Sequence, residues 1–254
     1  MSVNTMNHSG ADPVSSRAAG LARNLGLVLE RTGLLGLAEL LADRTMPNAL
    51  SYRRTFVVRA HCAGEPHPEL APTRLCSLKP ALIALFAELA RTREPEIQHM
   101  SEGELAERFA CGDELWLFHA DGAIGHLRWV TRRPLALTSF TLPLGRDERL
   151  GVDTITLPAA RRRSLARMAS SHVRHVLGSE GVISLYGLVN SSNRRWRAGM
   201  QRMGYSPVAT VHLVSLAGRQ FVRVVPASAA EAELLEQRGI RGGRWLRARS
   251  GAAG

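Results

Sequence analysis

The sequence has little of what would place it among secreted, membrane-spanning or disulfide-rich proteins. It has three cysteines, Cys62, Cys76 and Cys111, and their odd number and wide spacing predict neither a disulfide framework nor a zinc site. No run of about 18 uncharged apolar residues occurs, so no transmembrane segment is predicted. The N-terminus opens with polar residues such as Asn4 and Asn7, unlike the basic and then apolar start of a secretory signal. We therefore expect a cytoplasmic protein.

Acidic residues are also few relative to basic ones. The 254 residues include 33 Lys and Arg against 22 Asp and Glu, a formal charge of +11. This excess predicts an anionic partner, which could be nucleic acid, a membrane surface or a phosphate-rich cofactor. The 45% of hydrophobic residues is enough to fill the core of one large domain or two small ones.

Composition and periodicity divide the chain into four segments. Residues 1–20 lack periodicity and are expected to be a disordered N-terminus. Residues 21–63 are interpreted as an N-terminal extension, with a helix over 21–44 and a strand over 52–60. A proline-containing linker leads to the main domain, residues 73–226, and residues 228–254 are expected to be a flexible basic tail.

The main domain alternates helical and extended patterns, which predicts an α/β protein, an α+β type with a mixed sheet. Pro80 suits the first residue of a helix, Ser101 suits the start of a second, and Asp121-Gly122 is a strong hairpin signal. Two successive strand-to-helix units follow, over 151–177 and 182–203. Parallel strands connected in this way bring the starts of both helices to the same edge of the sheet, where ligands bind.

Arginines cluster at these two helix starts. Three precede the first helix and three lie in the first turn of the second: Arg161, Arg162, Arg163, Arg194, Arg195 and Arg197. Cations there oppose the helix dipole at about 0.3 to 1 kcal/mol per charge, unless an anion lies between them. The free amides of a helix start bind phosphate, and arginine adds bidentate contacts. A solvated basic face remains the alternative interpretation.

The segment from Thr156 to Ala166 resembles the acyl-CoA loop of the GNAT N-acetyltransferase superfamily. In that loop a strand end is followed by Arg or Gln, two residues, Gly, one residue, and Gly or Ala. Arg161 and Ala166 match this pattern, and Ser164 stands where the family usually has Gly. A second match is the stretch from Asn190 to Tyr205, an Asn after a buried strand, a short helix and Gly204-Tyr205.

The resemblance implies a GNAT-like acyltransferase fold and the transfer of acetyl from acetyl-CoA, or another acyl-CoA, to a primary amine of a small molecule or peptide. The implied cofactor-binding residues are Ile155, Leu157, Arg161, Arg162, Arg163, Ser164, Leu165, Ala166, Asn190, Asn193 and Arg197. Asp153 is the candidate catalytic base, because it is the only acid on the expected cofactor strand, residues 151–157. Met200 occupies the position of the family's usual Tyr acid.

Three other functions remain open. The domain could be a degenerate GNAT that binds CoA or a partner without catalysis, as Met200 and Ser164 suggest. It could bind nucleic acid through the tail arginines Arg238, Arg241, Arg244, Arg247 and Arg249. The helix at 21–44 could rest on a membrane surface. No metal site is predicted, since His172 and His175 lack partners with matching spacing.

Overall fold

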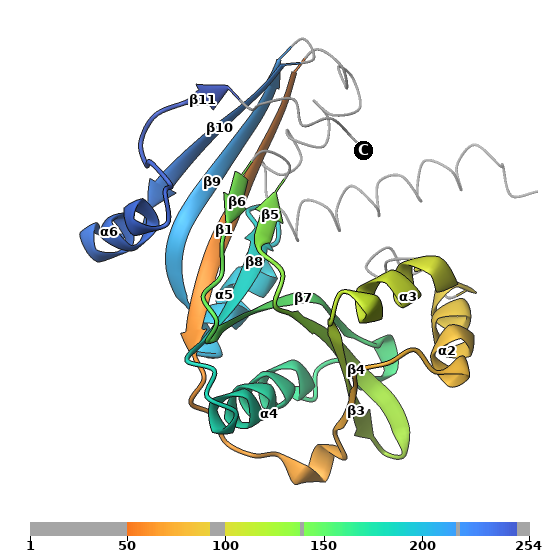
Figure 1. The fold of residues 1–254 in the computed structure, drawn as a ribbon. Coiled ribbons are helices and arrows are strands. Elements are labelled where there is room, and N and C mark those ends of the chain that lie inside the picture. The colour runs from red at the N-terminus through yellow and green to blue at the C-terminus, as the bar shows by residue number, and fades with distance from the viewer. Residues whose placement is uncertain (1–49, 92–99, 138–139, 217–218, 248–254) are drawn as a thin grey trace, which may run out of the picture.

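The computed structural model describes residues 50–91, 100–137, 140–216 and 219–247 (Figure 1). The described strands form a nine-stranded sheet in the order β11-β10-β9-β1-β8-β7-β4-β3-β2, and a two-stranded sheet, β5-β6. Within the large sheet β7 and β8 are parallel, and all other neighbouring pairs are antiparallel. The predicted α/β class with a mixed sheet is confirmed.

The described strands are β1 (Leu50–His61), β2 (Thr73–Leu75), β3 (Glu114–Ala120), β4 (Ala123–Thr131), β5 (Leu135–Leu137), β6 (Phe140–Leu142), β7 (Glu148–Thr156), β8 (Ser184–Asn190), β9 (Ser206–Leu216), β10 (Arg219–Pro226) and β11 (Leu246–Arg247). The described helices are α2 (Pro80–Arg91), α3 (Glu102–Ala110), α4 (Leu165–Ser179), α5 (Arg194–Arg202) and α6 (Ala229–Gln237), with 3-10 turns η1 (Pro68–Leu70) and η2 (Pro158–Ala160). Within the described ranges, no helix is long and apolar enough to cross a membrane.

Several local signals act as the sequence predicts. Pro80 begins α2, and Ser101 caps α3 in a capping box with Glu104, so two helix-start amides are satisfied. Asp121 and Gly122 connect β3 to β4 with φ of 54° and 78°. Positive φ at both central residues is what a type I′ hairpin requires.

Helices cover both faces of the sheet around β3 and β4 (Figure 1). On one face α4 packs Ala169, Val173 and Leu177 against the sheet, all fully buried. On the other face α2 and α3 form a separate apolar cluster around Trp129. β4 is therefore covered on both sides, and polar side chains on it are buried whichever way they point. A third cluster lies under β5 and β6 and extends to α6.

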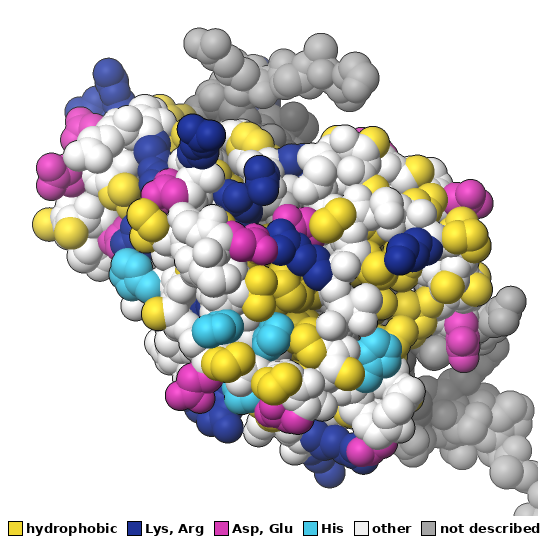
Figure 2. All heavy atoms as spheres, turned by 60° about the horizontal axis from the view of Figure 1, so that its bottom comes forward, with side chains coloured by type: hydrophobic (Ala, Val, Ile, Leu, Met, Phe, Trp, Pro, Cys, Tyr) yellow, Lys and Arg dark blue, Asp and Glu magenta, His cyan; other side chains and the backbone are white. Residues whose placement is uncertain are grey.

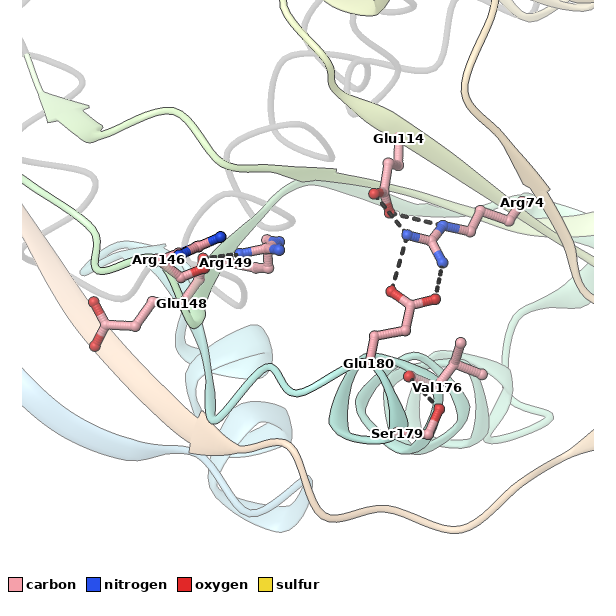
Figure 3. A network of polar contacts seen from close by, with 8 residues as sticks. All are labelled: Arg74, Glu114, Arg146, Glu148, Arg149, Val176, Ser179 and Glu180. Atoms are coloured by element: carbon pink, nitrogen blue, oxygen red, sulfur yellow. Dashed lines mark hydrogen bonds and ion pairs between the residues drawn. The ribbon is translucent and has the colours of Figure 1, made fainter.

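Ion pairs hold together the end of the sheet at which β7 and β8 begin, here called the closed end. Arg74 of β2 donates to Glu114 at the start of β3, with Nε–Oε2 and Nη2–Oε1 distances of 2.9 and 2.7 Å. It also binds Glu180, just after α4, with an Nη2–Oε2 distance of 3.1 Å (Figure 3). The guanidinium stacks over Trp116, 5.1 Å from the ring centroid. One arginine thus ties α4 to two strands.

The strand expected in an N-terminal extension is part of the main sheet. β1 lies between β8 and β9 and pairs with both, for example Val57 with Leu188 and with Ala209. Val57 is completely buried. The expected boundary at residue 63 therefore does not separate this strand from the rest of the sheet. The expected helix at 21–44 and the N-terminus at 1–20 lie outside the described residues.

The segment from residue 228 contains ordered structure up to residue 247, which corrects the expectation of a flexible tail. Ser228 caps α6, and β11 pairs with β10. Arg238 binds Glu148 at the start of β7 through two contacts of 2.8 Å. Burial alone would raise the pKa of Glu148, but the bonds from Arg238 and from the Gly145 amide lower it. Residues 248–254 lie outside the described part.

Candidate functional site

The parallel strands β7 and β8 stay together over only half of their length. Glu148–Gly151 pairs with Ser184–Gly187, and no later pair is present, although both strands continue for several residues. The pairing of β7 with β4 shifts register nearby, between Leu127 and Trp129, and Asp153 adopts φ of 45°. A bulge of this kind bends a strand. We call the diverging half the splayed end, where the β8-facing edge of β7 is unpaired.

A cavity of about 270 Å³ occupies the splayed end. It is lined by Arg128, Gly151, Val152, Asp153, Thr154, Gly187, Leu188, Trp196 and Met200. The last paired residues, Gly151 and Gly187, line it, and because neither has a side chain, a neighbouring side chain lies directly against each. A Cβ on Gly151 would lie 2.3 Å from Nη2 of Arg128, and one on Gly187 would lie 2.7 Å from Cε of Met200.

Arg128 of β4 enters this cavity from the face covered by α4. It is only 4% exposed. Its Nη2 donates to the hydroxyl of Tyr205 at 2.8 Å, and its Nη1 donates to Oγ of Ser170 at 3.2 Å. Among the described residues its Nε has no acceptor and no carboxylate pairs with it. Sequence analysis did not single out this residue.

Asp153, the candidate base, does line the cavity. Its carboxylate forms an ion pair with Arg108 of α3. The guanidinium of Arg108 also lies over Trp129, 5.0 Å from the ring centroid. The carboxylate is thus oriented by α3, and a proton acceptor at this position would share its oxygens with that partner.

His126 lies two residues before Arg128 on β4 and is completely buried. Its Nδ1 is 2.8 Å from Oγ1 of Thr156 on β7, and its Nε2 has no described partner. Burial, with a smaller contribution from the charge of Arg128, lowers its pKa to about 3. The imidazole is therefore neutral at physiological pH. Sequence analysis did not single out His126 either.

The loop from β7 to α4 is a strained backbone segment. Arg162 has φ of 69°, and Ser164, the N-cap of α4, has φ of 57° and makes no side-chain cap bond. Non-glycine residues rarely adopt this left-handed region. Within the described part, the amides of residues 164–166 donate no backbone hydrogen bond, as expected of a helix start.

The arginines of this loop have local contacts. Nε of Arg161 donates to the carbonyl of Thr156 at 3.3 Å, and Arg163 pairs with Asp121 in the β3–β4 turn. Leu165 is buried against the sheet, Ala166 is the second residue of α4, and Arg162 makes no described polar side-chain contact. The loop therefore presents amides and basic side chains close to the end of β7.

The remaining sequence candidates have structural contacts of their own. Ile155 packs in the cluster around Trp129, and Leu157 packs against it, so a ligand would meet mainly their backbone. Asn190 accepts bonds from the amide and hydroxyl of Ser192, and Asn193 caps α5 by accepting from the amide of Trp196. The Arg197 guanidinium stacks over Phe56, 5.1 Å from the ring centroid. Met200 is buried in the cavity wall.

No protein-family model and no curated protein matches the sequence. The structure is similar to GCN5-related N-acetyltransferases from Kribbella flavida (15% identity, 71% of this chain and 63% of that one, TM-score 0.43) and Sphaerobacter thermophilus (14%, 72% and 56%, 0.43). It is also similar to a functionally unknown conserved protein from Staphylococcus epidermidis (7%, 70% and 67%, 0.46). The alignments span less than two thirds of the two acetyltransferase chains. Function therefore has to be argued from the site.

Proposed function

We propose that this protein is an acyl-CoA-dependent N-acyltransferase that transfers acetyl, or another acyl group, from CoA to a primary amine. The observation that carries the proposal is the interrupted pairing of β7 and β8. It leaves an unpaired strand edge beside a cavity and leads directly to a helix start rich in basic residues. A ligand with amide groups, a thioester and a pyrophosphate matches these three features in that order.

Each part of the cofactor finds a suitable group. The pantetheine amides would pair with the unpaired edge of β7 between Val152 and Thr156. The pyrophosphate would bind the amides of residues 164–166, aided by the loop arginines. The acyl group would then lie in the cavity, near Gly151, where an entering amine can attack the thioester carbon.

The transfer forms a carbon–nitrogen bond, breaks the carbon–sulfur bond and releases a proton from the amine. Asp153 is the carboxylate among the cavity-lining residues, so it is the group proposed to receive this proton, directly or through water. Met200 offers the departing thiolate no proton. A thiolate with a pKa of about 8.5 leaves readily near neutral pH, so this substitution does not forbid the reaction.

A second candidate is a domain that binds acyl-CoA without catalysis. Two observations favour it: Met200 in place of a proton donor and the ion pair that engages Asp153. The two candidates differ in turnover. Release of free thiol in the presence of a panel of amines would support the enzyme, and tight CoA binding with no release would support the binding module.

Nucleic-acid binding has less support. Arg238 of the expected basic tail is engaged with Glu148 rather than free for phosphate. On the face shown in Figure 2, basic side chains are scattered and stand beside acidic ones rather than forming one continuous surface. Titration with duplex DNA over a range of salt concentrations provides the comparison.

The test of cofactor placement is calorimetric titration of the full chain with acetyl-CoA, using Ser164→Asp. A carboxylate at this helix start should repel the pyrophosphate and weaken binding by about tenfold or more. Ser228→Asp is the matched control, because it places the same charge at the N-cap of α6. It should leave the affinity unchanged. Equal affinities of Ser164→Asp and wild type would mean that the cofactor does not bind here.

A further inference from the structure

Arg128 is a buried cation whose charge no described residue balances. Its side chain lies in the wall of the splayed-end cavity and its two hydrogen-bond acceptors, Ser170 and Tyr205, are neutral hydroxyls. Arginine remains protonated in proteins, so the charge cannot be removed by losing a proton. An uncompensated buried charge is costly, and buried charges are normally paired.

Two other arginines close to the sheet form ion pairs with carboxylates. Arg108 pairs with Asp153, and Arg133 pairs with Asp113. Arg149 also lacks a carboxylate, but it donates to the backbone carbonyls of Arg146 and Glu148 and is not among the cavity-lining residues. Arg128 alone among these combines deep burial, an unpartnered Nε and direct access to the cavity.

The surrounding residues hold the guanidinium in place. Tyr205 and Ser170 fix its two terminal nitrogens, and their oxygens are 3.5 Å apart. The guanidinium lies directly against Gly151, since a Cβ on this residue would be 2.9 Å from Cζ of Arg128. A cation oriented by neutral groups in a cavity is the arrangement expected of a site for an anionic ligand group.

We propose that Arg128 binds a carboxylate of the ligand that occupies the splayed-end cavity. A planar carboxylate fits a guanidinium, whereas the CoA phosphates already have a place at the loop of residues 164–166 under the proposed function. The carboxylate has two possible sources, the far end of a dicarboxylic acyl group or the α-carboxylate of an amino-acid acceptor. Both sources of the carboxylate rest on the proposed function, whereas the anion site at Arg128 does not.

Two matched pairs of ligands distinguish the sources in calorimetric titrations of the full chain. Succinyl-CoA against butyryl-CoA tests a carboxylate on the acyl group. Alanine against alaninamide, each with saturating CoA, tests a carboxylate on the acceptor. In one of the two pairs, the ligand with the carboxylate should bind at least about tenfold more tightly than its partner without one, as expected for charge-assisted hydrogen bonds.

Substitutions then assign the preference to Arg128. Arg128→Gln should abolish it, and Arg128→Lys should retain part of it. Tyr205→Phe should reduce it by loosening the guanidinium. Arg202→Gln is the matched control, because Arg202 is an exposed arginine on α5. It should bind all four ligands as the wild type does.

The outcomes separate this inference from the proposed function. If acetyl-CoA binds but neither pair shows a carboxylate preference, or if the preference survives Arg128→Gln, the carboxylate site is wrong and the acyltransferase proposal stands. If no acyl-CoA binds, the proposed function fails. In that case, thermal stabilisation by free succinate or alanine that disappears in Arg128→Gln would still support the carboxylate site. If neither ligand stabilises the wild type, the carboxylate site is overturned as well.

Discussion

The two ends of β7 and β8 differ in the partners of their arginines: Arg74 and Arg238 at the closed end pair with carboxylates, and Arg128 at the splayed end pairs with none among the described residues. At the closed end Arg74 donates to two glutamates and Arg238 donates to Glu148, so these two charges are balanced within the chain, and Arg149 donates to backbone carbonyls. At the splayed end Arg128 is more deeply buried and meets only hydroxyls. Removing one partner of a balanced pair leaves a buried charge and destabilises the fold, whereas a charge that is already unbalanced beside a cavity becomes favourable only when a ligand balances it. The comparison therefore assigns stability to one end and binding to the other.

The largest effect is expected at Arg74. Arg74→Met leaves Glu114 buried without its partner, and breaking a buried pair in this way costs about 3 to 5 kcal/mol. Because Arg74 is about a quarter exposed and Glu180 is more exposed, we expect the low end, about 3 kcal/mol of unfolding free energy. Urea denaturation measures it.

The matching control for Arg74→Met is a double variant that also replaces Glu114 with Gln. Removing the stranded charge should recover part of the lost stability. If Arg74→Met alone unfolds at the same urea concentration as the wild type, the closed end is not held by this pair, and the contrast between the two ends disappears.

A second prediction concerns pH and the neutral His126 at the splayed end. Its folded pKa of about 3 lies below the ordinary histidine value of about 6.5 because burial disfavours the charged imidazole. Its contribution to stability is therefore complete above pH 6.5 and is lost as the pH falls toward 3, by about 1 kcal/mol per pH unit.

Denaturation curves between pH 7 and 4.5 test this. His126→Leu should flatten the pH dependence over that range, whereas His61→Gln, on an exposed histidine of β1, should keep the wild-type slope. An unchanged slope in His126→Leu would show that another group controls acid sensitivity and that the imidazole is not buried as described.

Much of the local structure could be predicted from the sequence, because the signals are themselves local. Pro80, Ser101 and Asp121-Gly122 act within a few residues of where they stand. The place of β1 could not be predicted in the same way, because it depends on pairing with strands more than 120 residues further along the chain. The structure after residue 228 could have been found from the Ser228 cap signal, which the arginine-rich composition obscured.

The candidate site was only partly accessible to sequence reasoning. Asp153 was proposed as the base because it is the only acid over residues 151–157, and the structure places it in the lining of the cavity. Arg128 and His126 were missed because polar residues alternating along a strand usually indicate a solvent-facing side. Here α4 covers that side, so the same pattern places both residues in the interior. Only the tertiary arrangement distinguishes these two cases.

A third prediction is that replacing Arg128 changes stability in the opposite direction from replacing Arg74. Arg128→Met in the ligand-free protein should raise the unfolding free energy by about 1 kcal/mol, because an unbalanced charge is removed and the two hydroxyls can still bond each other. Arg128→Lys keeps the charge and should show no gain. A loss of several kcal/mol in Arg128→Met would mean that the arginine is a structural bridge between Ser170 and Tyr205, as Arg74 is at the closed end.

The smallest effect is expected at Ser164, where the backbone is strained. Its φ of 57° is a region that glycine enters freely, so Ser164→Gly should relieve strain in the folded state. Glycine also gives the unfolded chain more freedom, which offsets part of that gain. The net change should be a rise in unfolding free energy of about 0.5 kcal/mol or less.

Ser164→Gly is informative when two changes are measured together, the change in unfolding free energy and the change in acetyl-CoA affinity. If the loop binds the pyrophosphate, the glycine allows closer backbone approach, and acetyl-CoA affinity should be equal or higher while stability is nearly constant. Ser192→Gly is the matched control, since Ser192 lies in the turn before α5 and has no positive φ. It should lose stability without a gain in affinity. A Ser164→Gly variant that is more stable but binds acetyl-CoA more weakly would mean that the serine side chain itself contacts the ligand, so the strain is retained for binding rather than incidental to it.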